Sequence, residues 1–175
     1  MRRTELRYIK IGYKGRFIMN ISIAEHWNPE KHELPGINCI VFPNGTITIL
    51  NCYSLYDPNT KESEFFCSPM CDTTIESIAK YNDDYWTIVD EWVSIDYQDG
   101  KIHGGDGQMG NEGFIACTDA EDRLVWGIFF ENSNPIKNLE IKDNIIIVAM
   151  NEHTELQIEI NLENLTQIKM TCIKS

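Results

Sequence analysis

The chain has 175 residues, and its 27 acidic and 15 basic side chains give a formal net charge of −12. With 42% hydrophobic residues it can bury a core of its own, so we expect one domain over residues 1–175. The longest apolar run, Ile145–Met150, is far shorter than the roughly 20 residues that a membrane-spanning helix needs. An acidic balance also disfavours nucleic-acid binding, which depends on Lys and Arg at the phosphates. We therefore expect neither a membrane nor a nucleic acid as partner.

The N-terminal segment combines basic charge with a strand pattern. Its charged residues are not followed by the apolar stretch of a secretory signal, so we expect a cytoplasmic protein whose six cysteines remain thiols. Apolar residues alternate over 16–24 and predict a strand, which would form an opening hairpin with the less regular run before the turn at 13–15. A polar loop is expected next, over 28–36.

Two further elements carry specific local signals. A Pro-Asn-Gly turn at 43–45 separates the apolar runs 37–42 and 46–56, and Asn-Gly between such runs is a strong hairpin signal. Further along, Thr-Thr-Ile-Glu at 73–76 fits a capping box, in which side chains satisfy the free N–H groups of a helix start. Apolar residues at helical spacing follow it, so one short helix is predicted near 73–81.

The middle of the chain is less regular. Over 85–92 apolar residues recur at helical spacing, while β-branched and aromatic residues favour a strand, so both structures remain open there. A strand is expected at 93–97. Six of the eleven glycines fall within 100–113, and because glycine permits tight turns, this segment is predicted to be a loop.

The C-terminal third contains an internal repeat. Residues 113–136 align with 145–168 at an offset of 32, and each copy contains a strand, a polar turn, an alternating strand and a return. Two copies are too few for a propeller, which needs at least four blades. The sequence predicts a mainly β protein: an antiparallel β-sandwich, or a meander of successive hairpins.

The charge is unevenly distributed. Residues 1–16 contain six basic side chains and one acidic one, whereas residues 83–122 contain eleven acidic side chains and one basic one, Lys101. The second segment therefore carries a net charge of −10 within forty residues. A charge run is usually a solvated face that maintains solubility, but this one also contains Tyr and Trp, which anchor protein interfaces inside charged rims.

Catalytic and metal-binding signatures are weak. The sequence lacks G-x-S-x-G, H-E-x-x-H and a phosphate-binding glycine-lysine loop, and pairs of carboxylates in an acidic segment have little specificity. Cys67 and Cys71 have a spacing suited to half of a zinc site, but His26 and His32 precede them in the wrong order. We therefore expect a non-enzyme without a cofactor or metal, with cysteines that pack as small apolar residues.

The acidic segment predicts a binding surface for a basic partner, because a concentrated negative field accelerates the encounter with a positive one. The candidate partner-binding residues are Asp83, Asp84, Trp86, Asp90, Glu91, Trp92, Asp96, Asp99 and Asp106. Trp126 lies in an alternating strand and is expected in the core instead.

Part of the chain resembles a known class of proteins. The pattern G-G-D-G-x-M-G-N-E-G-F at 104–114 and D-x-x-x-x-L-V-W-x-I-F-F-x-x-S-N-P at 119–135 resemble small cytosolic immunity proteins of bacterial contact-dependent growth inhibition and other polymorphic toxin systems. The resemblance covers about a fifth of the chain. It implies a non-catalytic antitoxin that binds a cognate toxin domain and blocks its active site. Many such toxins are nucleases, whose basic faces match an acidic inhibitor.

A second hypothesis comes from a different class of protein. The glycine-rich 100–113 segment, with its carboxylates, would also suit a sugar- or metal-binding β-domain, although it lacks the ligand order of a calcium-binding EF-hand loop.

Overall fold

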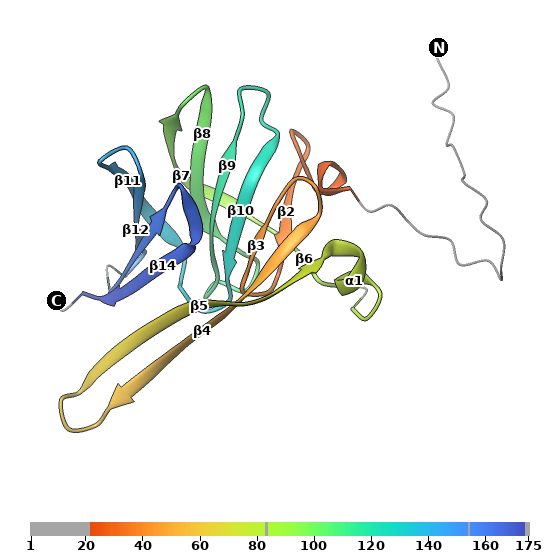
Figure 1. Ribbon diagram of the computed structural model, residues 1–175. Helices are drawn as coiled ribbons and strands as arrows, with labels where there is room; N and C mark the ends of the chain where they lie inside the picture. The colour runs from red at the N-terminus through yellow and green to blue at the C-terminus, as the bar shows by residue number, and fades with distance from the viewer. Residues whose placement is uncertain (1–21, 83, 154, 174–175) are drawn as a thin grey trace, which may run out of the picture.

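The computed structural model describes residues 22–82, 84–153 and 155–173. Over these residues the protein consists of antiparallel strands in three sheets, with a short helix α1 at Ile75–Ala79 and a single 3-10 turn at Ile23–Glu25 (Figure 1). The predicted mainly β class, with one short helix near 73–81, is confirmed.

The largest sheet has seven strands in the order β5-β4-β3-β10-β9-β8-β7. Its strands are β3 (Cys39–Val41), β4 (Thr46–Asp57), β5 (Glu62–Thr74), β7 (Asp90–Tyr97), β8 (Gly100–Asp106), β9 (Gly113–Thr118) and β10 (Leu124–Phe130). Strands β7 to β10 form a meander, and β10 then pairs with β3, which comes much earlier in the chain. This long-range pairing leaves β5 and β7 as the two edges of the sheet.

A second sheet is a four-stranded meander formed by the C-terminal residues. It contains β11 (Ile136–Lys142), β12 (Ile146–Asn151), β13 (Leu156–Asn161) and β14 (Asn164–Cys172). The internal repeat is confirmed at the level of elements, because the hairpin β9–β10 corresponds to the hairpin β12–β13 at the same offset. Leu124 and Leu156 occupy equivalent positions at the start of the second strand of each hairpin.

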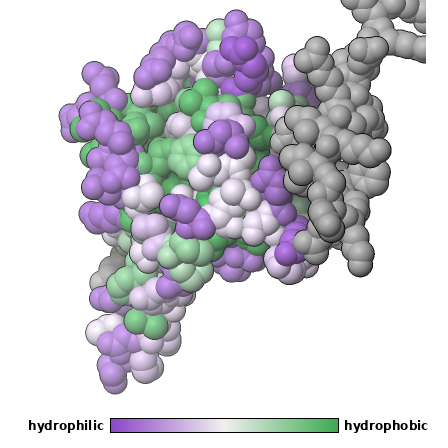
Figure 2. Space-filling model, turned by 45° about the vertical axis from the view of Figure 1, so that its right-hand side comes forward, coloured by the Kyte–Doolittle hydropathy of each residue, from purple (hydrophilic) through white to green (hydrophobic). Residues whose placement is uncertain are grey.

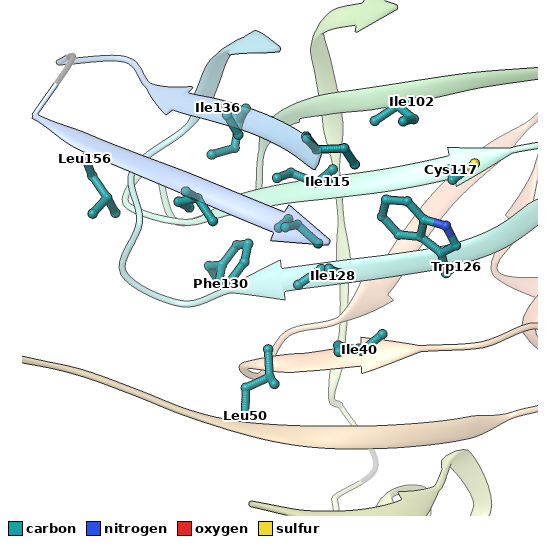
Figure 3. Packing of buried hydrophobic residues seen from close by; sticks show 14 residues of the cluster. Ile40, Leu50, Ile102, Ile115, Cys117, Trp126, Ile128, Phe130, Ile136 and Leu156 are labelled. Atoms are coloured by element: carbon teal, nitrogen blue, oxygen red, sulfur yellow. The ribbon is translucent and has the colours of Figure 1, made fainter. Parts of the chain in front are cut away.

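These two sheets enclose the larger core. Alternate residues of β10 point into it, and Figure 3 shows Trp126, Ile128 and Phe130 on one side of that strand, facing residues that include Ile136 and Leu156. Trp126 is 7% exposed and is therefore a core residue, as predicted. The sandwich follows from the period of two along each strand, which places every second side chain in the same layer.

A third sheet covers the opposite face of the seven-stranded sheet. It consists of β1 (Trp27–Asn28), β2 (Lys31–Pro35) and β6 (Trp86–Ile88). The expected polar loop at 28–36 is thus wrong: it holds a tight turn and β2, because Leu34 is fully buried in a second core with Phe114 and Phe129.

Three local predictions are corrected or resolved by the structure. The expected strand at 16–24 is wrong at its end, because Ile23–Glu25 is a 3-10 turn whose N-cap is Ser22. Residues 1–21, which include the expected opening hairpin, lie outside the described residues. The helix begins one residue later than the capping box implies, because Thr74 is the N-cap and accepts a hydrogen bond from Ser77 N. The ambiguous stretch 85–92 contains β6 and the first residues of β7, so it is strand.

The predicted hairpin at 37–56 is confirmed and continues into the long hairpin β4–β5. Gly45 has a φ of 81°, and the side chain of Asn44 accepts a hydrogen bond from Thr46 N, so the turn uses both residues that predicted it. Strands β4 and β5 then extend well beyond the body of the protein (Figure 1). In the part of the chain that the structure describes, no helix is long and apolar enough to span a membrane.

Candidate functional site

Strand β7, the edge of the seven-stranded sheet, carries most of the predicted binding residues. Among the strands that the structure describes, it pairs with β8 alone. Val93, Ile95 and Tyr97 pack toward the core of the sandwich, so the alternation along the strand turns Asp96 outward. Because a strand of eight residues is about 25 Å long, the edge alone is as long as a typical protein interface.

Trp92 is exposed because it lies in a β-bulge. Glu91 pairs with Gly105 and Val93 with Gly104, so Trp92 between them has no partner residue on β8 and is 47% exposed. The bulge requires Gly105, since a Cβ at that position would collide with the Asp90 carbonyl oxygen and approach Trp92 N to 2.9 Å. A large aromatic side chain is thereby presented on an acidic edge.

The glycine-rich segment 100–113 is only partly a loop. The predicted loop is wrong over its first half, because Gly100–Asp106 is strand β8 and only 107–112 connects β8 to β9. A Cβ at Gly104 would lie 2.8 Å from Ile136 Cγ2, so glycine here allows the second sheet to approach closely. Within the remaining loop, the buried Glu112 accepts a hydrogen bond from Met109 N at 3.1 Å. That carboxylate is used within the loop. For the sugar- or metal-binding hypothesis, the candidate loop is therefore reduced from 100–113 to 107–112.

The acidic side chains gather at the two ends of the β7–β8 pair. Asp90 lies opposite Asp106 at one end, while Asp96 lies opposite Lys101 near the other end, next to the turn that contains Asp99. Asp96 lies six positions after Asp90 along the strand, a distance of about 20 Å. The segment therefore presents two negative regions joined by the strand that carries Trp92, and not one compact patch.

The end near Asp99 is extended by the turn between β9 and β10. Gly100 lies directly against the backbone of Thr118 and Asp119, which brings the two turns together. Hydrogen bonds from Arg123 hold the pKa of Asp119 below its usual range, and Arg123 also pairs with Glu121 at 2.9 Å. This single basic residue compensates part of the negative charge in the second turn.

At the other end, Asp106 is in an unfavourable environment. Burial, followed by the charges of Asp90 and Glu152, raises the pKa of its carboxyl group although the Gly107 N–H stabilises the charge. Its Oδ1 is buried and has no hydrogen-bond partner among the described residues. Like charges directly opposite each other in a sheet are destabilising, so this pair lowers stability.

Glu91 is engaged within the protein. Its carboxylate lies 2.6 Å from His103 Nδ1, and His103 Nε2 lies 2.9 Å from Thr118 Oγ1. Burial favours a higher pKa for Glu91, but the hydrogen bonds from His103 and Ser94 outweigh it and keep the pKa below the usual range. The order Thr, His, Glu resembles a catalytic triad, yet Thr118 is 3% exposed, so a substrate cannot reach its hydroxyl. The arrangement fastens β7 to β8 and β9.

Trp86 is also engaged within the protein. Its ring stacks on His26 with centroids 3.5 Å apart and planes 8° apart, and His26 in turn contacts Glu33 at 2.7 Å. Asp84, which precedes β6, is exposed. The predicted binding residues therefore fall into two groups. Asp84, Asp90, Trp92, Asp96 and Asp99 are exposed and have no side-chain hydrogen bond or ion pair with another described residue, whereas Glu91, Trp86 and Asp106 contact other residues or are partly buried. Asp83 lies outside the described residues.

The possible zinc ligands are not assembled. His26 and His32, just before β1 and in β2, contact the carboxylates of Glu33 and Asp122, whereas Cys67 and Cys71 lie on β5, in a different sheet. Across 22–82, 84–153 and 155–173, no three His, Cys, Asp or Glu side chains form a group suited to a metal ion.

Sequence reasoning missed the strand β5 and the surface that it forms with β4. Tyr53 and Phe66 stack with centroids 5.0 Å apart, and the apolar side chains of Leu55 and Met70 are also exposed. Figure 2 shows hydrophobic residues on the body of the molecule and further ones on this protruding hairpin. The neighbouring aromatic residues Phe65 and Phe66, after the polar turn at 58–61, were the available signal for β5.

Comparisons with protein-family models, with curated proteins and with solved structures gave no match, so the site is interpreted from its own geometry and chemistry.

Proposed function

We propose that this protein is a non-catalytic immunity protein, which binds the toxin domain of a bacterial toxin system and blocks its active site. The observation that carries the proposal is the exposed edge strand β7, where free carboxylates flank an exposed tryptophan. Lys101 is the one Lys or Arg in β7 and β8, against five acidic residues in the same 90–106 segment. Such a surface suits a basic partner with a groove for a polyanion, as in a nuclease.

The mechanism is electrostatic attraction followed by anchoring of an aromatic side chain. Two negative regions about 20 Å apart would attract a basic surface and align it along β7. Trp92 lies between them, where it can be desolvated by the partner and can contribute a large share of the binding energy. The sequence resemblance to immunity proteins supports the same activity, and no catalytic group of this protein is required.

The partner is best identified by affinity capture. The tagged protein is expressed in its native bacterium, and captured proteins are identified by mass spectrometry and then tested for toxic activity. We expect a protein with a small basic toxin domain, whose activity is abolished by one equivalent of this protein. The proposal is contradicted if the captured partner retains its activity in the complex. It is also contradicted if a glycan or a divalent metal ion raises the melting temperature of this protein and the captured protein does not.

A further inference from the structure

We infer that Cys52 and Cys67 form a reversible modification site, at which a small-molecule disulfide oxidises the two thiols to an internal disulfide bond. Both are free thiols in the structure. From the sequence we expected the cysteines to pack as small apolar residues. The inference is independent of the proposed toxin partner, because it rests on the hairpin β4–β5 alone.

The geometry of the pair is close to that of a disulfide. Cys52 and Cys67 are directly opposite in the register of β4 and β5, and their Sγ atoms lie 2.8 Å apart. A disulfide bond is about 2.05 Å long, so the sulfur atoms need to approach by less than about 1 Å. Opposite residues of antiparallel strands have Cα atoms roughly 4.5 to 5.5 Å apart, which is within the range for a disulfide. No change of register is needed.

Each cysteine lines a hollow of the protein surface. Cys52 lines a cavity of about 330 Å³ that also contacts Phe65 and Met170, and Cys67 lines a second one of about 400 Å³ beside β14. Both cysteines are half-buried. The site therefore has room beside each cysteine for a small disulfide.

The reaction proceeds in two exchange steps. One cysteine of the pair, as its thiolate, displaces one thiolate from the small disulfide and forms a mixed disulfide. The other cysteine then loses its proton and attacks the protein sulfur of that mixed disulfide, and the second small thiolate departs and takes up a proton. One small disulfide and two protein thiols thus give one protein disulfide and two small thiols. The hydrogen bond to Cys52, together with burial, raises the pKa of the Cys67 thiol, so the pair is stable as thiols until an oxidant is present.

The bond would lock the base of the protruding hairpin. Residues 53–66, including the stacked Tyr53 and Phe66, lie between the two cysteines, and their middle part forms the protruding end of the hairpin (Figure 1). Closing this loop reduces the freedom of the open hairpin, so amide hydrogen exchange in 53–66 should become slower in the oxidised protein.

The test uses oxidised glutathione on the intact protein, followed by alkylation, mass spectrometry and peptide mapping. The wild type is compared with Cys52→Ser, Cys67→Ser and Cys71→Ser; the last removes an exposed thiol on the same strand and is the matched control. We expect wild type and Cys71→Ser to lose two alkylatable thiols as a 52–67 crosslink without an adduct at either position. Each of the other two variants should instead carry glutathione on its remaining cysteine of the pair.

Persistent glutathione on Cys52 or Cys67 of the wild type would overturn the inference. A second contradicting result is that both thiols stay unreacted in the folded protein, although the same oxidant forms the 52–67 crosslink when the chain is unfolded in denaturant. Circular dichroism of each Ser variant establishes that it is folded before the comparison is made.

Discussion

Trp92 and Trp86 belong to the same acidic segment but have different environments. Trp92 is 47% exposed at a bulge, whereas Trp86 stacks on His26. Trp92→Ala should therefore weaken binding of the partner by at least about tenfold, as for a central interface anchor, and leave the free energy of unfolding within about 1 kcal/mol of wild type. Calorimetric titration and thermal unfolding measure the two effects.

Trp86→Ala is the matched control for that variant. It should lower the melting temperature, because the stack on His26 is lost, while affinity for the partner stays within a factor of about three. If Trp86→Ala weakened binding more than Trp92→Ala did, the bulge would not be the anchor of the interface.

Asp106 provides a test of the electrostatics at one end of β7. Its folded-state pKa is raised above the ordinary value of 3.8 by burial and by the charges of Asp90 and Glu152. A raised carboxyl pKa means that the folded state binds more protons, so stability falls as the pH rises through the window from 3.8 to the folded value. Asp106→Asn should therefore raise the melting temperature at neutral pH, and the gain should disappear in acid.

The control for this prediction is Asp99→Asn, which removes an exposed carboxylate from the β7–β8 turn. We expect it to change stability by less than about 0.5 kcal/mol at every pH. A gain for Asp106→Asn that persisted unchanged below pH 3.8 would show that the substitution acts through packing and not through the charge.

At the scale of elements, β7 and β8 depend on glycine for a reason that composition alone does not reveal. The concentration of glycine at 100–113 is typical of a loop, yet Gly104 and Gly105 lie within a strand. The first allows the approach of Ile136 from the second sheet, and the second accommodates the bulge at Trp92. Both requirements come from neighbouring strands, so the local pattern could not distinguish a strand from a turn.

Gly105→Ala tests this explanation. The added Cβ would collide with the backbone of Asp90, which cannot move without breaking the β7–β8 ladder, so we expect a loss of more than about 2 kcal/mol in the free energy of unfolding. Gly110→Asn is the control, because Gly110 has a φ of 77° but open space around it, and Asn tolerates such a φ; the expected cost is below about 1 kcal/mol. Urea denaturation measures both. Equal costs would contradict a specific role for Gly105.

Elements with local signals were predicted well. The Asn-Gly turn fixed the hairpin of β3 and β4, and the polar turns of the repeat located β9–β10 and β12–β13. The helix was predicted within a residue at its start, because a Thr at either 73 or 74 can act as N-cap and only the backbone path selects Thr74. Strand β5 was missed, since most of its residues are exposed and its pattern is only partly apolar.

At the scale of the whole molecule, the sequence predicted the fold class, an antiparallel sandwich, but not which strands pair. Strand β3 pairs with β10, across more than eighty residues of sequence, and this pairing joins the hairpin β4–β5 to the meander of β7 to β10. The arrangement of the negative charge could not be predicted either. The sequence places it in the 83–122 segment, but its separation into two regions at the ends of β7 depends on the register of β7 and β8, in which Asp90 lies opposite Asp106 and Asp96 opposite Lys101.

Charged residues on an edge strand also prevent pairing with other strands, and this is an alternative reason for acids on β7. Lysine serves that purpose as well as aspartate does. Reversing the charge therefore separates the two roles: protection against aggregation is retained, while attraction of a basic partner is lost.

The most direct test of the proposed function is the affinity for the captured partner, measured as a function of salt, for a variant in which Asp84, Asp90, Asp96 and Asp99 are replaced by Lys. The matched control replaces Glu64, Glu140, Glu155 and Glu163, which are exposed elsewhere on the molecule, by Lys and therefore has the same net charge. We predict a loss of affinity of at least about 100-fold at low salt for the first variant, with a reversed salt dependence, and less than about tenfold for the control. Equal affinities and equal salt dependences for the two variants would contradict an acidic binding surface at β7.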